Sequence, residues 1–449
     1  MTLTSDSPAS VVAARRLALE LGQGGGGEPT GDPVITSVVD NGDGTLTIQG
    51  GNFGSKAQTA PVLVDYADHA YENGVLNDYH STFTDGQVVT NAQSDPNELW
   101  YTSFTSDVYG ANTNLLSRSS QQRHAQSQAH YRCRGDDAGF GGPMANGGET
   151  PSSASTKMYL AWWLRRKYTD LQFHVVLSDL SGSFIADEPI TINGVDGFYI
   201  GSHVRSEDGK TAHSFEMSSG SRLYGTYYGT AIVGVTSGAT ATFPATGSST
   251  ESPNSYVVAG AGTKLTRLRD NSNNQHLRSS HSLTDYFAFC IGAPNGYERT
   301  DHAPPQARDQ WFLVEEMVVI DPETETGKHF IHVNGKAWPK GTSEPFATFD
   351  ASTRDPSKNI WPSWIGNNAY EFLQQTDLDE IYFDTTLQRV YLGDAATISE
   401  CSHLEIQRPQ AWANGAVSVV KHEAGLSGQD QWVYVAGPDG LINEQGYAL

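Results

Sequence analysis

The stretch from Gln310 to Trp338, QWFLVEEMVVIDPETETGKHFIHVNGKAW, constrains the fold more than any other part of the chain. Residues 312–320 and 329–333 each carry side chains in a period-two pattern, and between them lie the turn-forming Asp321-Pro322 and Thr326-Gly327. Side chains that alternate along a strand point to opposite faces of a sheet, and Pro and Gly favour turns. The stretch therefore predicts a β-hairpin.

The rest of the chain agrees with this reading. Almost no segment has a 3.6-residue apolar period, and the chain contains 46 Gly and 20 Pro residues. This combination predicts an all-β protein with many loops. Its 449 residues are enough for two or three domains and a sizeable core.

Further strand-like motifs accompany the hairpin. They are a W-x-x-V-E run at 311–315, an Asn-Gly pair at 334–335, Leu-Asp-Glu-Ile-Tyr-Phe at 378–383 followed by 389–392, and Met-Tyr-Leu-Ala-Trp-Trp-Leu at 158–164. This set resembles the strands of concanavalin A-like jelly rolls. The resemblance covers roughly residues 96–395 and implies a lectin-like sandwich there.

The two ends of the chain carry a second pattern. Residues 33–66 read as a hairpin with a tight turn at 40–44, followed by Gly50, Asn52, Phe53 and Gly54. The stretch resembles the opening of an immunoglobulin-like IPT/TIG domain, and 404–409, 416–420, 431–435 and 438–440 resemble its closing strands. We predict one split domain, 33–95 plus 396–449, into which the jelly roll is inserted. Two separate small β units are the alternative.

A further insertion is expected inside the jelly roll. Residues 186–260 contain short β runs separated by Gly and Ser, including Gly234 to Thr242. They resemble small β modules of tailed-phage structural proteins. The polar residues 270–308 are expected to form a long surface loop.

Residues 1–32 are expected to form an N-terminal arm. Ser7-Pro8 is typical of a helix start, Gly22 of a stop, and a linker with four consecutive glycines follows. A disordered tail is one interpretation. The other, which we favour, is an anchor held by a neighbouring subunit or larger assembly through the apolar stripe Val11, Ala14, Ala18 and Leu21.

Charge and cysteine content exclude several classes. The chain has 28 Lys and Arg residues and 51 Asp and Glu residues, which gives a formal net charge of −23. A surface with this charge repels phosphate backbones, which argues against nucleic-acid binding. Cys133, Cys290 and Cys401 lie far apart and are expected to be buried thiols. Neither a transmembrane helix nor a signal peptide is predicted.

A search for catalytic residues yields no assembled constellation. Asp377, Asp379, Glu380 and Asp384 are the densest acidic cluster, but Asp379-Glu380 is also the usual polar opening of a closing strand in lectin-like folds. Glu315 and Glu316 are weaker candidates. No spacing typical of a metal site, a phosphate loop or a cofactor fingerprint is found.

Carbohydrate binding is harder to exclude. Arg123, His124, His130 and Tyr131 have the residue types of a lyase-like concave face, and the loop-like Trp361 and Trp364 could form a sugar platform. The alternative for the first four residues is ordinary polar contacts on the concave face, and the alternative for the two tryptophans is packing.

In this combination of features the chain resembles phage virion proteins that decorate capsids or build tails and fibres. We expect a non-enzymatic capsid decoration, head-fibre or tail protein on the particle surface, assembled in the host cytoplasm. Expected partners are the major capsid or tail protein, with further copies of this chain and a host-surface glycan left open. The alternatives are a polysaccharide lyase, a glycoside hydrolase or a carbohydrate-binding module, and a bacterial surface adhesin.

Overall fold

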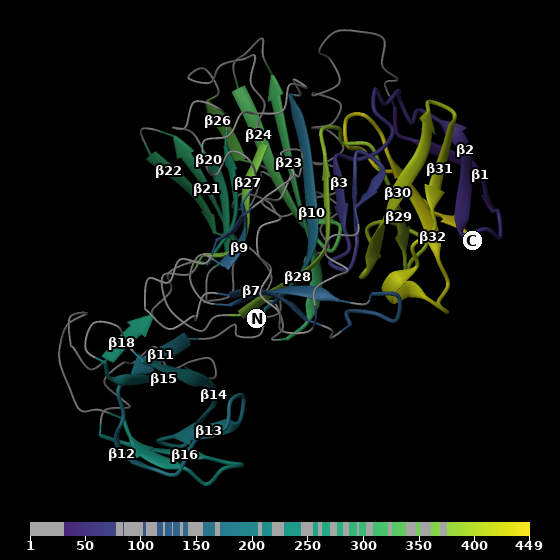
Figure 1. The fold of residues 1–449 in the computed structure, drawn as a ribbon. Helices are drawn as coiled ribbons and strands as arrows, with labels where there is room; N and C mark the ends of the chain where they lie inside the picture. Colours follow the sequence, from purple (N-terminus) through teal and green to yellow (C-terminus); the bar gives the residue numbers. More distant parts are fainter. Residues whose placement is uncertain are drawn as a thin grey trace.

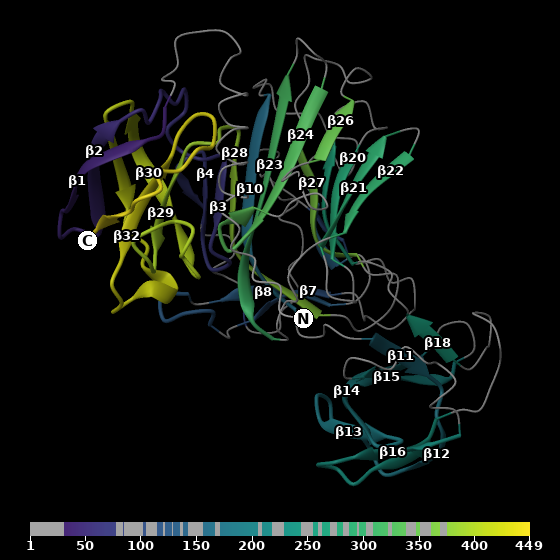
Figure 2. The same ribbon diagram turned by 180° about the vertical axis from the view of Figure 1, so that it is seen from behind.

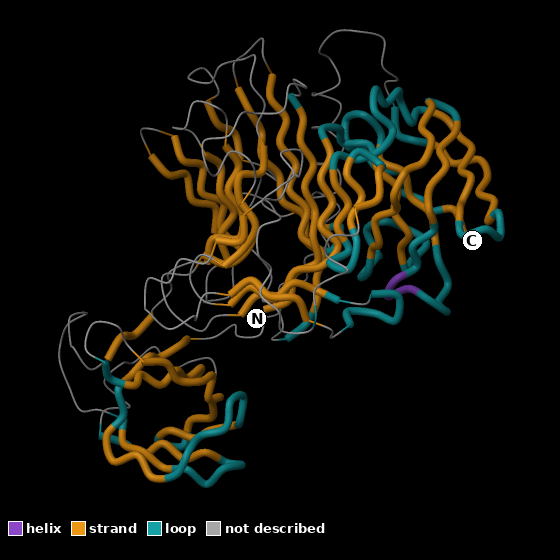
Figure 3. The backbone as a smooth tube through the Cα atoms, viewed as in Figure 1, coloured by secondary structure: helices purple, strands orange, loops and turns teal. Residues whose placement is uncertain are grey.

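The protein is all-β with several sheets (Figures 1 and 3). The computed structural model describes residues 31–77, 84, 102–104, 115–119, 122–127, 129–134, 138–141, 156–166, 171–204, 209–217, 229–243, 255–258, 263–269, 276–281, 287–293, 296–301, 309–321, 326–337, 347–350, 361–368 and 375–449. One short 3-10 helix, η4 (Ala424–Leu426), lies in these ranges. No helix in the described part is long and apolar enough to cross a membrane.

The first sheet, here called the terminal sheet, combines strands from both ends of the chain. Its order is β1 (Val34–Asp40), β2 (Thr45–Gly51), β31 (Ala416–Val420), β30 (Leu404–Ala413), β29 (Arg389–Gly393), β32 (Trp432–Ala436) and β33 (Tyr447–Ala448). β30 connects two halves of this sheet, because residues 404–407 pair with β29 while residues 408–413 pair with β31. Phe53, Val390 and Val417 belong to one core between the halves.

The long sheet has eleven strands and contains the hairpin that organises the sequence. Its order is β25 (Lys336–Ala337), β24 (Thr326–Val333), β23 (Trp311–Asp321), β10 (Lys157–Arg166), β28 (Gln375–Asp384), β3 (Leu63–Asp65), β4 (Ala70–Glu72) and β5 (Val75–Asn77), with β26 (Ala347–Asp350) on β24 and β8 (His130–Arg134) joining β7 (Leu115–Ser119) to β28. The predicted hairpin is confirmed, since β23 and β24 pair antiparallel from Val314↔Val333 to Asp321↔Thr326.

The facing sheet lies opposite the long sheet (Figures 1 and 2). Its order is β22 (Gly296–Asp301), β21 (Phe287–Ala293), β20 (His276–His281), β19 (Thr263–Arg269), β27 (Trp361–Asn368), β9 (Ala138–Gly141) and β6 (Thr102–Phe104). A buried hydrogen bond crosses between the two sheets, in which the Thr266 hydroxyl donates to Glu316 at 2.7 Å. The expectation of a surface loop over 270–308 is wrong, because the paired strands β20, β21 and β22 lie within it.

A fourth sheet stands apart from the other three in both ribbon views. Its order is β12 (Ser178–Ser181), β17 (Thr240–Thr242), β16 (Ala231–Gly234), β13 (Pro189–Ile192), β14 (Val195–Val204), β15 (Thr211–Met217), β11 (Leu171–Val175) and β18 (Ser255–Val258). It has its own core, including Ile190, Phe215 and Phe243. This sheet begins at Leu171, earlier than the insertion expected at 186.

The long sheet is buried on both faces, which explains its nearly continuous apolar sequence. Residues 158–164 and 312–319 are all buried. Tyr159 and Trp163 pack with Tyr391 and Tyr434 of the terminal sheet, whereas Glu316 and its register partner Leu160 face the opposite way. Strands covered on both sides have little need for polar alternation.

Two segments lie in a different sheet from the one that the sequence boundaries implied. Residues 63–77, assigned to the terminal unit, form β3 to β5 at the edge of the long sheet, beside β28. Residues 389–393, assigned to the jelly roll, form β29 within the terminal sheet. Pairing partners far along the chain decide where both segments go. The arm, with Val11, Ala14, Ala18 and Leu21, lies outside the described residues.

Candidate binding pocket between the terminal and long sheets

Arg123 is the centre of a buried polar cluster where the terminal and long sheets meet. Its guanidinium lies 2.6 Å from Glu380 and 3.5 Å from Asp379, and it donates two hydrogen bonds to Glu405, at 3.0 and 3.1 Å. The side chain is only 2% exposed, and it covers the ring of Trp163 at 4.2 Å. One cation therefore holds carboxylates from β28 and β30 together.

A β-bulge brings two adjacent acids of β28 onto this arginine. Ala161 of β10 pairs with Tyr382 and Trp163 pairs with Asp379, so that Glu380 and Ile381 together oppose Trp162. Glu380 has a positive φ of 47°. Such a bulge re-aims a side chain, and here it lets Asp379 and Glu380 contact the same guanidinium although strict alternation would place them on opposite faces.

Burial and charge act on the carboxyl pKa values in opposite directions. Burial and the charge of Glu380 hold the pKa of Asp379 well above its ordinary value. Burial also disfavours ionised Glu380, but Arg123, His422 and the hydrogen bonds from His124 and His422 outweigh it, and its pKa is well below the ordinary value. Asp379 therefore keeps its proton to higher pH than Glu380 does.

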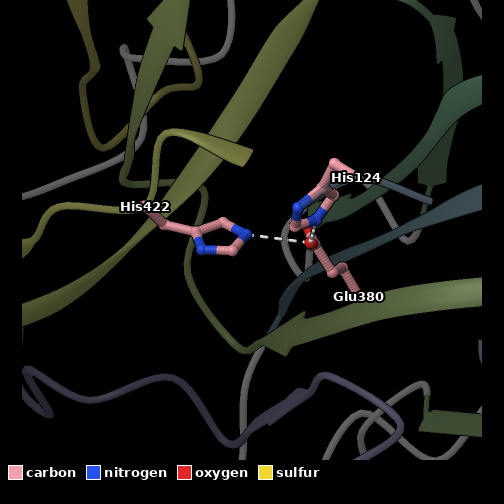
Figure 4. A group of neighbouring side chains, drawn as sticks. All are labelled: His124, Glu380 and His422. Carbon is pink, nitrogen blue, oxygen red and sulfur yellow. Dashed lines mark hydrogen bonds and ion pairs between the residues drawn. The ribbon is translucent and has the colours of Figure 1, made fainter. Parts of the chain in front are cut away.

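Two imidazoles point at one oxygen of Glu380 (Figure 4). His124 Nε2 lies 2.6 Å and His422 Nε2 lies 2.8 Å from Glu380 Oε1. The three possible ligand atoms are within 4.8 Å of one another, which is compact enough for a metal centre.

The hydrogen bonds of His124 do not fit a metal ligand. The backbone N–H groups of Gln126 and Ser127 both donate to His124 Nδ1, each at 3.2 Å. An Nδ1 that accepts carries no proton, so the proton of the neutral ring is on Nε2 and is donated to Glu380. A metal would need the Nε2 lone pair. The group therefore fits a carboxylate that receives three donors, since Arg123 contacts the same oxygen.

A pocket of about 140 Å³ opens beside this cluster. Tyr66 packs against His422 with ring centroids 5.2 Å apart, and His69 forms a 2.8 Å contact with Asp68. The guanidinium of Arg408 covers the ring of Tyr71 at 3.8 Å. The pocket is lined by Tyr66, Asp68, His69, Tyr71, Gln126, Ser127, Glu380, Arg408, Val420 and His422.

The pH dependence of stability should carry the signature of His422. Burial lowers its pKa, but the charge and hydrogen bond of Glu380 and the charge of Glu405 outweigh this and raise it above 6.5. A raised folded-state pKa gives stability that is fully present below pH 6.5 and is lost as pH rises through the folded value. The loss is at most about 1.4 kcal/mol per pH unit. Urea unfolding on both sides of pH 6.5 should show a shallower decline for His422→Gln than for the wild type.

Lys421→Gln is the matched control for this measurement. Lys421 is the neighbouring residue, and its pKa is raised from a value of 10.5, so it does not titrate near neutral pH. The unfolding free energy of Lys421→Gln should decline with pH as steeply as that of the wild type. Parallel curves for His422→Gln and the wild type would contradict the assignment.

The four residues expected to line one concave face are not together. Arg123 and His124 belong to the cluster above. His130 is fully buried, 3.5 Å from Asp377, and Tyr131 is fully buried and donates to Asp65 at 2.8 Å. Neither of the latter two side chains is accessible to a glycan in this structure. Trp361 and Trp364 belong to β27, but their side chains lie outside the described part.

The acids that the sequence offered as catalytic candidates are buried in the structure. The hydroxyl of Tyr159 donates to Glu315 at 2.7 Å, and Lys56 pairs with Asp384 at 2.5 Å. Asp377 is bound by Arg165 at 2.5 Å. The contacts of Glu315 and Asp377 join neighbouring strands of the long sheet, and of the acidic cluster named in the sequence Glu380 alone lines the pocket.

Sequence reasoning missed His422 as a partner of Glu380 and Arg408 as a residue of the same pocket. Glu380 is 256 residues from His124 and 42 from His422, so no local motif connects them. Comparisons of the chain with protein families and with curated proteins find no match.

Proposed function

We propose that this chain is a non-enzymatic structural or accessory protein of a virion, which displays a lectin-like domain on the particle surface. In this proposal the terminal sheet is an immunoglobulin-like IPT/TIG sandwich, and the long and facing sheets form a concanavalin A-like jelly roll. The fourth sheet is a small inserted module. The division of the terminal sheet into two packed halves and the opposition of the long and facing sheets support these assignments.

One observation carries the proposal. β1, which follows the predicted arm in the sequence, lies beside β32 and β33 in the terminal sheet, at the end opposite the facing sheet (Figure 1). An arm attached there would leave the two large opposed sheets free on the other side. The buried cluster around Arg123 fixes the terminal sheet to the long sheet, as a rigid display unit requires.

Deleting residues 1–30 should abolish incorporation into particles and leave folding intact. The described sheets make their cores without these residues. Immunogold labelling of particles, with an antibody raised against residues 156–385, should show regular labelling for the full chain and none for the truncated chain. The two chains should have equal midpoints of thermal unfolding. Normal labelling of the truncated particles would show that the arm is not the anchor.

The pocket favours a second candidate, a polysaccharide-active protein. Two imidazole–carboxylate pairs, His69 with Asp68 and His422 with Glu380, line one small cavity, and such pairs serve as general acids and bases. Incubation with a panel of polysaccharides tests it. Products that disappear in His422→Gln would favour an enzyme, and no product with any polysaccharide would reject one.

A further inference from the structure

Arg408 differs from the other basic groups of the pocket. His69 is held by Asp68, and His422 is held by Glu380. The guanidinium of Arg408 lies 3.8 Å from the centroid of the Tyr71 ring, and within the described ranges no carboxylate pairs with it. An aromatic ring covers one face of a guanidinium and leaves its N–H edges available. The pocket therefore offers one cation with free donors.

The charges that line the pocket select a monoanion. Asp68 and Glu380 are the acids of the lining, and Asp68 is hydrogen-bonded to His69 while Glu380 is paired with the buried Arg123. Arg408 is the cation of the lining without a carboxylate partner in the described part of the chain, so one extra negative charge balances it. A doubly charged phosphate would leave a second negative charge beside these acids. The formal charge of −23 of the whole chain also disfavours polyanions. A planar carboxylate matches the fork of a guanidinium with two parallel hydrogen bonds.

The remaining polar groups suit hydroxyls next to that carboxylate. Gln126 accepts from the N–H of Ala424 through Oε1 at 2.9 Å, so its amide NH2 is left to donate. His69 uses Nδ1 for Asp68, which leaves Nε2. A volume of about 140 Å³ corresponds to roughly four or five waters, which is room for part of one sugar residue and not for an extended chain.

We propose that this pocket binds the carboxylate and adjacent hydroxyls of a single acidic sugar residue, of the uronate type, at the end or branch of a glycan. Arg408 binds the carboxylate, and His69, Gln126 and His422 contact the hydroxyls. The site lies between β30, β31 and the segment from the β3–β4 turn to β4, not on the face between the long and facing sheets. This inference rests on the glycan-displaying part of the proposed function and gives that part a ligand class.

Titration of the purified full-length chain with glucuronate and with glucose, followed by calorimetry, tests the proposal. The two sugars differ by the carboxylate, so glucuronate should bind and glucose should bind at least about tenfold more weakly. Arg408→Gln should weaken glucuronate binding roughly tenfold to a hundredfold, because it removes a charge-assisted pair. Arg408→Lys should retain part of the binding. Lys421→Gln is the matched control, since Lys421 pairs with Asp40 and Glu423 outside the pocket.

Several outcomes would overturn the assignment. Equal binding of glucose and glucuronate, or unchanged binding by a folded Arg408→Gln variant, would remove the role of the carboxylate. Acetate or inorganic phosphate binding as tightly as glucuronate would show a simple anion site. Absence of binding to glucuronate and galacturonate at millimolar concentration would reject the acidic-sugar site. Particle labelling is independent of all these results, so failure of the virion proposal and failure of the ligand proposal are distinguishable.

Discussion

Arg123→Met should lower the free energy of unfolding by about 3–5 kcal/mol, the cost of removing one partner from a buried ion-pair network. Arg123 is the one group that contacts Asp379, Glu380 and Glu405 together within the described part of the chain. Asp379 and Glu405 are fully buried. Without the guanidinium, these acids must keep uncompensated charge or take up protons. Urea unfolding followed by tryptophan fluorescence at neutral pH measures the loss.

Two further variants make this result specific to charge. Lys421→Met removes a partly exposed cation that pairs with Asp40 and Glu423, and it should cost no more than about 1 kcal/mol. Adding Glu380→Gln and Glu405→Gln to Arg123→Met removes the uncompensated acids and should recover part of the loss. A mild effect of Arg123→Met, equal to that of Lys421→Met, would mean that the cluster does not hold the sheets together.

Phe53→Ala should cost about 3–5 kcal/mol, the usual range for deleting a fully buried aromatic ring. The ring is 0% exposed and packs in the core between the two halves of the terminal sheet. Its carbonyl, which accepts from Gln388 at 2.9 Å and from Trp412 at 3.2 Å, is retained in the variant. The expected loss therefore comes from the cavity and the lost apolar burial, and thermal or urea unfolding measures it.

Hydrogen exchange would show how far the effect of Phe53→Ala spreads. Because residues from both ends share this core, amide protection should fall in β29 and β32 as well as in β2. Val39→Ala, on the neighbouring strand β1, is the control, since Val39 is 52% exposed and should change stability by less than about 0.5 kcal/mol. Exchange that rises in β2 alone would mean that the two halves are energetically independent.

Local patterns were sufficient for several individual strands. The alternation at 312–320 and 329–333 predicted β23 and β24, and the turn at 40–44 predicted the hairpin of β1 and β2. Period-two alternation and turn residues lie within a dozen positions of one another, so a single sequence records them. The same holds for the general all-β character.

The sequence did not determine which strands share a sheet or which polar groups share a site. Residues 389–393 read equally well as a strand of either sheet, and their partners β30 and β32 decided the matter. Residues 270–308 were too polar to suggest β20 to β22. Glu380 reaches Arg123 through a bulge that alternation cannot predict. His422 meets Glu380, and Arg408 joins the same pocket, through tertiary packing alone. These features depend on long-range contacts, which leave no local pattern.

The composition of the terminal sheet from both ends also sets an order of events during synthesis. β2 pairs with β31, which leaves the ribosome only after almost all of the remaining chain. Until then the apolar side chains of Leu46 and Ile48 lack their partners Val419 and Val417. Contacts so distant in sequence close late and slowly. During synthesis the hairpin of β1 and β2 therefore waits without its partner strand β31 while the strands of the long sheet are made. Until the terminal sheet closes, the exposed apolar edge of this hairpin is open to aggregation and to chaperones.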